Sequence, residues 1–284
     1  MTIRKMEIKI LSPQWGHEHL PLTDFLDKVR LSGYDGVDTW IPLNKDDKRL
    51  LFDYLQQHQM YLVSHQHRAE GCTFKKFRAS FIENLEECAE PKPLLINSHT
   101  GRDYFSFDQN LALIDTALEF SAKTGIRVVH ETHRGRLGYS PQMLTDFFAT
   151  RPDFRITADF SHWVCVTESM LENFTLIMDE AVKRSIHIHA RVGFEQGPQV
   201  ADPRAPEWAY ALHQFLGWWD KIISVNNQLG IPLFTITTEF GPEPYMPKVP
   251  FSNKPMANQF EINTFMKDLL CKRYNTPSSA FNKP

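Results

Sequence analysis

The sequence predicts an α/β protein, a parallel (β/α)8 TIM barrel, on three observations. Eight short apolar segments alternate along the chain with longer stretches of helical spacing. Such alternation is typical of βαβ units, and eight units make one barrel of about 250 residues. No GxGxxG motif follows the first apolar segment, which disfavours an open dinucleotide-binding sheet. We therefore expect residues 1–284 to form a single barrel domain, with 275–284 as a loosely held tail.

The predicted strands are short apolar runs of the length expected for buried parallel strands. In chain order they are Glu7–Leu11, Gly36–Trp40, Tyr61–Ser64, Pro93–Asn97, Ile126–His130, Arg155–Ala158, Ser185–Ile188 and Leu233–Thr238. The helices expected between them are Thr23–Ser32, Asp46–Gln59, Thr73–Glu90, Asp108–Lys123, Pro141–Thr150, Thr167–Val182 and Glu207–Gln228. Thr73 and Ser106 supply N-cap side chains, and Gly33, Gly125 and Gly230 stand where helices should end.

Composition and charge narrow the class of protein. Hydrophobic residues make up 42% of the chain and charged residues 23%, which are ordinary values for a globular protein. The formal net charge is −3 with no basic stripe, so we expect no binding to nucleic acid. The first residues contain no signal-peptide core, and no apolar run is long enough for a membrane span. The four cysteines lack zinc-site spacing, so we expect reduced thiols in a cytoplasmic protein.

Histidines and carboxylates gather where six consecutive predicted strands end, from the third to the eighth. Eight of the 12 histidines fall in these short segments, at positions 65, 67, 99, 130, 133, 162, 187 and 189. In a barrel of this kind, polar residues at the carboxyl ends of strands form the active site, because the strand interiors pack as an apolar core. The clustering therefore predicts a functional site at this end of the barrel.

Four of these residues predict a metal site, since each ends a different strand from the fifth to the eighth: Glu131, Asp159, His189 and Glu239. Three carboxylates in one cavity would repel one another unless a cation lay between them. Carboxylates with one imidazole suit Mn, Mg, Co or Zn. Considered alone, Glu239 is also consistent with one half of a structural ion pair. His130 and His187 are each also consistent with a buried histidine of the core.

Several short motifs lie at or near the predicted strands: Gly33-Tyr34-Asp35-Gly36-Val37-Asp38, His130-Glu131-Thr132-His133, Asp159-Phe160-Ser161-His162, His187-Ile188-His189 and Thr238-Glu239-Phe240. These motifs resemble those of the xylose-isomerase-like TIM barrels, a superfamily of sugar isomerases and epimerases that includes inosose dehydratases and type IV AP endonucleases. The resemblance covers about residues 7–270.

The resemblance implies roles for individual residues. Ketose 3-epimerases of the superfamily bind their metal through Glu, Asp, His and Glu on strands five to eight, which places the ligands on the four residues above. It also implies that His162 and, more loosely, Arg191 bind substrate oxygens. We expect His67, His99 and His133 to line the substrate site, and Trp15 or Trp40 to stack on a sugar ring.

The function predicted is a divalent-metal-dependent sugar isomerase or epimerase that acts on a ketose or related polyol. Glu131 and Glu239 would transfer the protons. The absence of a Gly-rich phosphate loop favours an unphosphorylated small-molecule carbohydrate over a phosphorylated one, and a homo-oligomer is compatible with the sequence.

Three alternatives stay open: an inosose-type dehydratase, an AP-endonuclease-like phosphodiesterase and a non-catalytic sugar-binding barrel. The endonucleases require an Asp-x-His pair after the seventh strand, where this chain has Asp202-Pro203-Arg204.

Overall fold

Eight parallel strands close into a barrel in the computed structural model, which describes residues 6–276. Each strand pairs with its neighbours in chain order, and β8 closes on β1 with Leu233 opposite Glu7. The strands are β1 (Glu7–Pro13), β2 (Gly36–Thr39), β3 (Tyr61–Gln66), β4 (Leu95–Ser98), β5 (Val128–Glu131), β6 (Ile156–Ala158), β7 (Ser185–His189) and β8 (Leu233–Thr237). The predicted (β/α)8 barrel is confirmed, and each strand lies within one or two residues of its predicted bounds.

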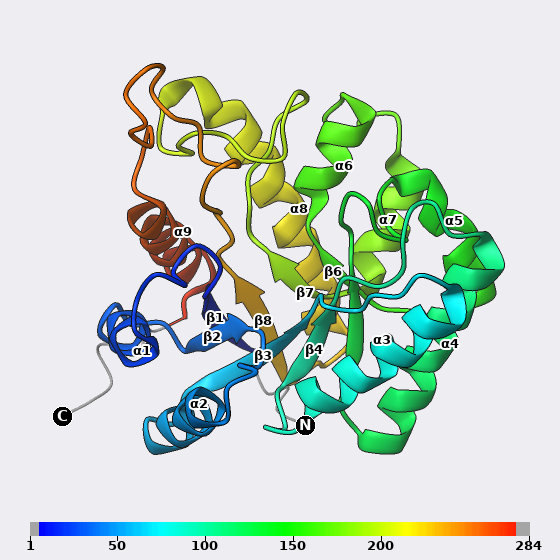
Figure 1. Cartoon of the computed structure of the whole chain (residues 1–284). Helices are drawn as coiled ribbons and strands as arrows, with labels where there is room; N and C mark the ends of the chain where they lie inside the picture. Colours follow the sequence, from blue (N-terminus) through cyan, green and yellow to red (C-terminus); the bar gives the residue numbers. More distant parts are fainter. Residues whose placement is uncertain (1–5, 277–284) are drawn as a thin grey trace.

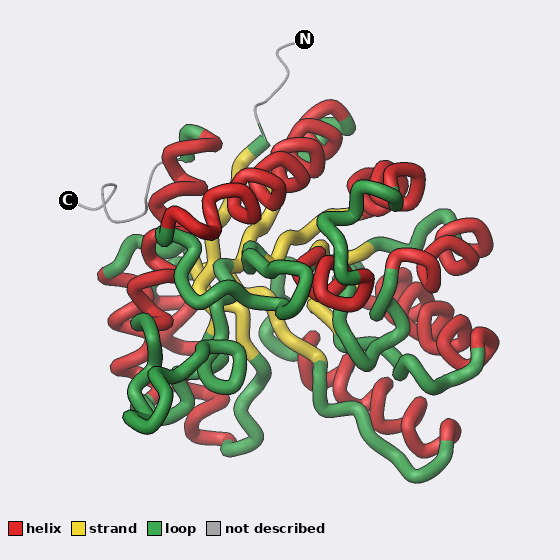
Figure 2. The backbone as a smooth tube through the Cα atoms, turned by 90° about the horizontal axis from the view of Figure 1, so that it is seen from above, coloured by secondary structure: helices red, strands yellow, loops and turns green. Residues whose placement is uncertain are grey.

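Helices surround the barrel, so that the strands lie inside a ring of helices in Figures 1 and 2. They are α1 (Leu22–Leu31), α2 (Lys45–Gln57), α3 (Phe74–Ala89), α4 (Phe107–Thr124), α5 (Pro141–Thr150), α6 (Phe160–Thr167), α7 (Thr175–Arg184), the 3-10 turn η1 (Pro206–Trp208), α8 (Ala209–Gln228) and α9 (Gln259–Tyr274). The expected caps are present: Thr73 accepts the Lys76 N–H, Ser106 and Gln109 form a capping box, and Gly125 ends α4 with φ 75°.

Two helical predictions differ from the structure. The helix predicted over Thr167–Val182 is correct only in its second half, because α7 begins at Thr175. Helix α6, which the apolar spacing did not predict, begins directly after β6 and ends at Thr167. The Asp159 carboxylate accepts the Ser161 N–H and so caps α6 immediately after the strand. Helix α9 was not predicted, because its buried side includes the polar residues Asn263 and Lys267, which obscure the apolar spacing.

The apolar core has an inner and an outer part. Leu11, Val63, Leu95 and Val129 form a cluster contributed by β1, β3, β4 and β5. A separate apolar cluster joins strand residues of β4 and β5 to α3 and α4. Because side chains alternate along a strand, Glu131 shares the face of Val129 and therefore points into the barrel.

The described helices include none long and apolar enough to cross a membrane. The tail was expected over residues 275–284. Of these, 277–284 lie outside the described residues. Residues 1–5, on which the signal-peptide expectation partly rests, also lie outside them.

Candidate functional site

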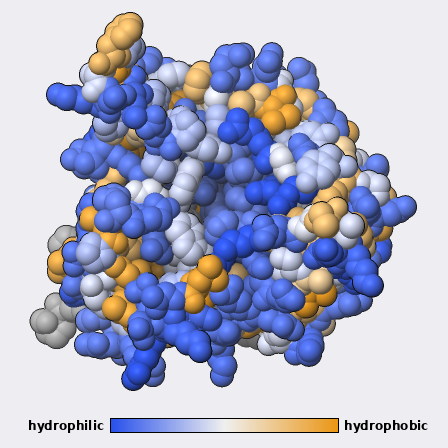
Figure 3. Space-filling view, in the orientation of Figure 1, coloured by the Kyte–Doolittle hydropathy of each residue, from blue (hydrophilic) through white to orange (hydrophobic). Residues whose placement is uncertain are grey.

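A cavity of about 390 Å³ opens at the carboxyl end of the barrel. Its volume falls within the range of small-molecule sites. The face in Figure 3 is hollowed near its middle, and the residues around the hollow are mostly hydrophilic. Aromatic side chains form part of the cavity wall, and charged or imidazole side chains form most of the rest: Trp15, Trp40, Tyr245, Asp38, His65, His67, His99, His133, Arg136, His189, Arg191 and Glu239.

The structure brings the four predicted metal ligands together. Glu131 and His189 are the last residues of β5 and β7, Asp159 directly follows β6, and Glu239 follows β8 by two residues. All four are buried, and one donor atom from each lies within 4.8 Å of the others. Parallel strands end at one edge of the barrel, so residues distant in sequence converge there.

Several ligand atoms in this group have no hydrogen-bond partner in the described structure. Glu131 Oε1, His189 Nδ1 and Glu239 Oε2 are buried and unpartnered. His189 Nδ1 lies 2.5 Å from Glu239 Oε2 and 3.6 Å from Glu131 Oε1, which are ion-pair distances without hydrogen-bond geometry. Buried polar groups are nearly always hydrogen-bonded, so three orphaned polar atoms facing one another indicate a ligand site.

The electrostatics of the group reflect its crowded carboxylates. Burial alone would lower the pKa of His189, but Glu239 and Glu131 outweigh it and raise this pKa well above its usual value. Burial raises the pKa of the Asp159 carboxyl, with Arg191 opposing and the Glu239 and Glu131 carboxylates adding to the rise. A cation among these groups would relieve the repulsion between the carboxylates.

Arg191 and His162 form a buried pair beside the four predicted ligands. The Arg191 guanidinium donates to Asp159 Oδ2 and, at 2.9 Å, to His162 Nε2. Arg191 also lines the cavity, where its guanidinium carbon lies 4.9 Å from the Tyr245 ring centroid. His162 is fully buried and is not among the cavity-lining residues, with its ring 3.9 Å from that of His133. The geometry therefore indicates that His162 acts on a substrate only through Arg191 and His133, which line the cavity.

The other predicted histidines lie in the cavity wall. His67, His99 and His133 all line it, and His99 Nε2 lies 3.0 Å from Glu131 Oε2. His65 packs its ring 4.6 Å from that of His99. Two further groups of donor atoms share Glu131 with the main one, His65–His99–Glu131 and Glu131–His133–His162. Burial lowers the pKa of His65, His67, His133 and His162, which keeps these imidazoles neutral.

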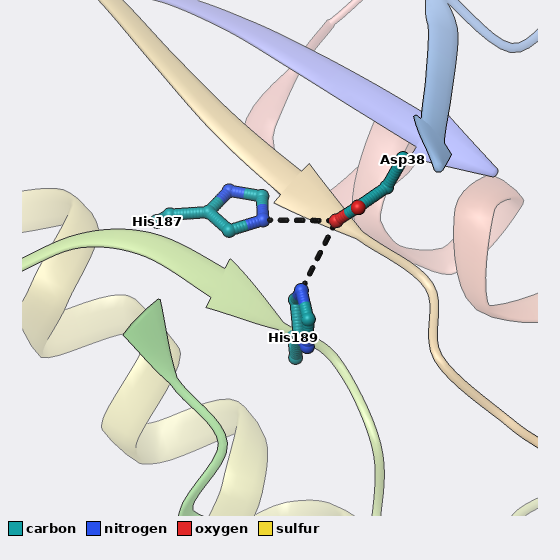
Figure 4. A group of neighbouring side chains, drawn as sticks. All are labelled: Asp38, His187 and His189. Carbon is teal, nitrogen blue, oxygen red and sulfur yellow. Dashed lines mark hydrogen bonds and ion pairs between the residues drawn. The ribbon is translucent and has the colours of Figure 1, made fainter. Parts of the chain in front are cut away.

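Asp38, near the end of β2, was missed by the sequence analysis. Its Oδ2 lies 3.1 Å from His189 Nε2 and 3.5 Å from His187 Nε2 (Figure 4). It also accepts a 2.9 Å hydrogen bond from Thr237 Oγ1. Burial would raise the pKa of Asp38, but its hydrogen bonds with His187 and His189 lower it. A carboxylate at Nε2 holds that nitrogen as the donor and leaves His189 Nδ1 free for a ligand.

The positions of Asp38 and Asn97 in the sequence are themselves evidence that both belong to the site. Each lies near the carboxyl end of a predicted strand, as do the histidines and carboxylates of the third to eighth strands. Asn97 donates a 2.8 Å hydrogen bond to Glu131 Oε2 and so orients that carboxylate. The position near the carboxyl end of a strand therefore marks both Asp38, on the second strand, and the Asn97 amide, on the fourth, as site candidates.

The loop after β7 packs onto the loop after β8. Gln199 accepts from the Gly241 N–H at 2.7 Å and donates to its carbonyl at 3.2 Å. In the same loop, Asp202 is hydrogen-bonded to Arg204. It belongs to none of the groups of possible metal ligands found among residues 6–276. Asp202 therefore supplies no ligand to the cavity.

No protein-family model matches the sequence, and no curated protein matches it significantly. Solved structures do match. The probable 3-DHS dehydratase AsbF of Bacillus anthracis, involved in petrobactin synthesis, aligns at 15% identity with a TM-score of 0.62, over 94% of this chain and all of its own.

Two other matches have different activities in their names. The 3-keto-D-glucoside 4-epimerase YcjR of E. coli gives 11% identity and a TM-score of 0.56, over 94% of this chain and 100% of its own. Endonuclease IV of Thermus thermophilus gives 13% identity and a TM-score of 0.54, over 95% of this chain and 98% of its own. At such identities the matches establish the fold alone, a closed (β/α)8 barrel.

Proposed function

We propose that this xylose-isomerase-like barrel is a divalent-metal-dependent isomerase or epimerase that acts on a ketose or a related polyol. The observation that carries the proposal is the meeting of Glu131, Asp159, His189 and Glu239, three of which have an orphaned buried ligand atom. Uncompensated buried polar atoms are costly, and they are retained where a ligand satisfies them. The similar structures include an epimerase and a dehydratase, which supports sugar or polyol chemistry.

The residues present fit a divalent cation. Carboxylate oxygens and one imidazole nitrogen suit Mn, Mg, Co or Zn, and the donor atoms lie close enough for one ion to reach all of them after small adjustments. Such an ion, when bound, would polarise a substrate carbonyl and its neighbouring hydroxyl and acidify the C–H bond between them.

The protein's own residues would carry the proton transfer. Glu131 and Glu239 come from β5 and from the loop after β8, so they approach the site from different strands. One carboxylate would remove the proton from the carbon and the other would return a proton on the opposite face or to the adjacent carbon. Arg191 in the cavity wall would hold a substrate oxygen, with His162 behind it, and Trp15 and Trp40 would cover the apolar faces of the sugar.

Dehydration of an inosose-like polyol is the nearest alternative, because it begins with the same proton removal. The test of the proposal is metal analysis of the purified protein combined with turnover of a panel of ketoses and inososes in D2O. An isomerase or epimerase should incorporate solvent deuterium at the reacting carbon. Turnover with no deuterium incorporation would favour a hydride shift, and loss of water from an inosose would favour the dehydratase.

Asp38→Asn should weaken metal binding by about 10-fold, since loss of the group that orients a ligand histidine typically costs 10–100-fold. The change removes the negative charge at His189 Nε2 and keeps the shape of the side chain. Equilibrium dialysis against Mn²⁺ measures the effect. Asp146→Asn, on the exposed side of α5, is the matched control. Unchanged affinity in Asp38→Asn would show that Asp38 does not position His189.

Duplex DNA containing an abasic site should not be cut by the pure protein. The endonuclease alternative needs a ligand pair after β7, and Asp202 in that loop is bonded to Arg204 instead. A gel assay with a fluorescent duplex in the presence of Zn²⁺ or Mn²⁺ measures incision. Robust cutting that disappears in His189→Ala would contradict the proposed sugar chemistry and assign a phosphodiesterase activity.

A further inference from the structure

Arg136 is a cation without a partner in the wall of the cavity. It lies in the loop after β5 and lines the cavity with His67, His99 and His133. Its Nε is buried and has no hydrogen-bond partner, and no ion pair or side-chain hydrogen bond is found for this residue within the described part of the chain. A half-buried guanidinium is normally paired with a carboxylate or a carbonyl oxygen, because burying an unpaired charge is costly in free energy.

The other arginines around this side of the cavity are paired. Arg68 lies 3.3 Å from the Glu87 carboxylate, and Arg102 donates to the carbonyls of Gly101 and Ala69 at 2.7 and 2.9 Å. Arg134, two residues before Arg136, donates to the Tyr245 hydroxyl at 3.2 Å. Burial lowers the pKa of Arg136 and the positive charge of Arg102 adds to this effect, while Glu131, Asp103 and Tyr104 oppose it. None of these three groups forms an ion pair or a hydrogen bond with the Arg136 side chain in the described part of the chain, so its charge has no direct partner.

The position of Arg136 separates it from most of the acidic residues of the site. The β5–α5 loop is held onto the end of β4 by a hydrogen bond from the Leu137 N–H to the Thr100 carbonyl at 3.1 Å. This places the loop over the β4 side, whereas Asp159, His189 and Glu239 come from β6, β7 and the loop after β8. His67, at the end of β3, lines the same cavity and has a buried Nδ1 without a partner.

We propose that Arg136, assisted by His67, binds a carboxylate at the end of the substrate that lies on the β4 side of the cavity, away from Asp159, His189 and Glu239, so that the substrate is a sugar acid or a related polyhydroxy acid. This inference rests on the proposed function and deepens it by naming the substrate class. A guanidinium recognises a carboxylate through two parallel hydrogen bonds, and a neutral imidazole can add a third. A single carboxylate also matches the one unpaired arginine among the described residues of the cavity wall better than a phosphate dianion does.

The experiment compares anionic ligands with neutral ligands of the same carbon skeleton. The pairs are D-gluconate with D-sorbitol, D-glucuronate with D-glucose, and D-fructose 6-phosphate with D-fructose. Binding is measured by isothermal titration and by quenching of tryptophan fluorescence, since Trp15 and Trp40 line the cavity. Each titration is run on the protein as purified and after EDTA treatment. The variants are Arg136→Gln and Arg136→Lys, with Arg49→Gln on the exposed surface of α2 as the matched control.

At least one carboxylate ligand should bind about 10-fold more tightly than its neutral partner, because charge-assisted hydrogen bonds are the strong ones. Arg136→Gln should abolish this preference without weakening the neutral ligand, Arg136→Lys should keep part of it, and Arg49→Gln should keep all of it. The inference is wrong if no carboxylate is preferred, if the preference survives in Arg136→Gln, or if only the phosphate ester shows it.

The two proposals fail separately. A carboxylate preference that persists after EDTA treatment in a protein without metal affinity would overturn the proposed metal-dependent function alone. Metal binding and ketose turnover without any anion preference would overturn the assignment of Arg136 alone.

Discussion

Replacing either Glu131 or Glu239 by glutamine should lower turnover by about 10²–10⁴, the usual range for a general acid or base, while most of the bound metal is retained. Glutamine keeps an oxygen for the metal and has nearly the same shape, but it cannot accept a proton. The two glutamates are buried at the ends of different strands around one site, and each has one carboxylate oxygen without a hydrogen-bond partner. That oxygen is the metal ligand in the proposed site, and the second oxygen of each carboxylate is the proposed proton acceptor.

Turnover is measured with the best substrate of the ketose and inosose panel, and metal content is measured on the same samples. Glu86→Gln, an exposed change of the same kind on α3, is the control and should leave both quantities unchanged. Solvent deuterium should enter the substrate with the native protein and only slowly with either variant. Near-native turnover in one variant would reduce that glutamate to a ligand without a catalytic role.

His189→Ala should weaken the binding of divalent metal by about 100-fold or more, since loss of an outer hydrogen-bond partner of a ligand already costs 10–100-fold. The imidazole lies between Asp38 on one side and Glu239 on the other, at 3.1 and 2.5 Å. Its removal takes away the one nitrogen among the four proposed ligands and leaves three carboxylates with Asp38 in a buried site. Asp159→Asn should also weaken binding, by about 10-fold or more.

Both effects are measured by equilibrium dialysis against Mn²⁺ and Zn²⁺, with circular dichroism to verify folding. His213→Ala, exposed on α8, and Asp146→Asn, exposed on α5, are the matched controls. If His189→Ala binds metal as tightly as the native protein, the four residues do not form the metal site. A stoichiometry of about one ion per native chain is the expected starting value.

Much of the fold could be predicted because its signals are local. The apolar runs of β2, β3 and β8 are recognisable as strands from their own residues, and polar or glycine residues bound them. In the same way, Ser106 and Gly125 mark the two ends of α4. Prediction failed where tertiary contacts override the local pattern. Asp159 starts α6 directly after β6, and α9 buries Asn263, whose side chain bonds to the Phe240 backbone.

The candidate ligands could be predicted for the same reason. Each of the four ends or follows its own strand, so convergence is a property of any parallel barrel and needs no knowledge of side-chain contacts. The partners of these ligands could not be predicted in this way. Asp38 meets His189 across 151 positions of sequence, and Asn97 meets Glu131 across 34.

The sequence by itself determined the barrel, the end at which its polar residues meet and the types of atom offered there, because strand period and strand order are local. Only the tertiary structure decided which nitrogen of His189 faces Asp38, that Arg191 pairs with Asp159, and that Arg136 is left unpaired. These outcomes depend on the register between strands and on how side chains share a crowded interior. A hydrogen bond or its absence is set within a few tenths of an ångström, which the sequence pattern does not specify.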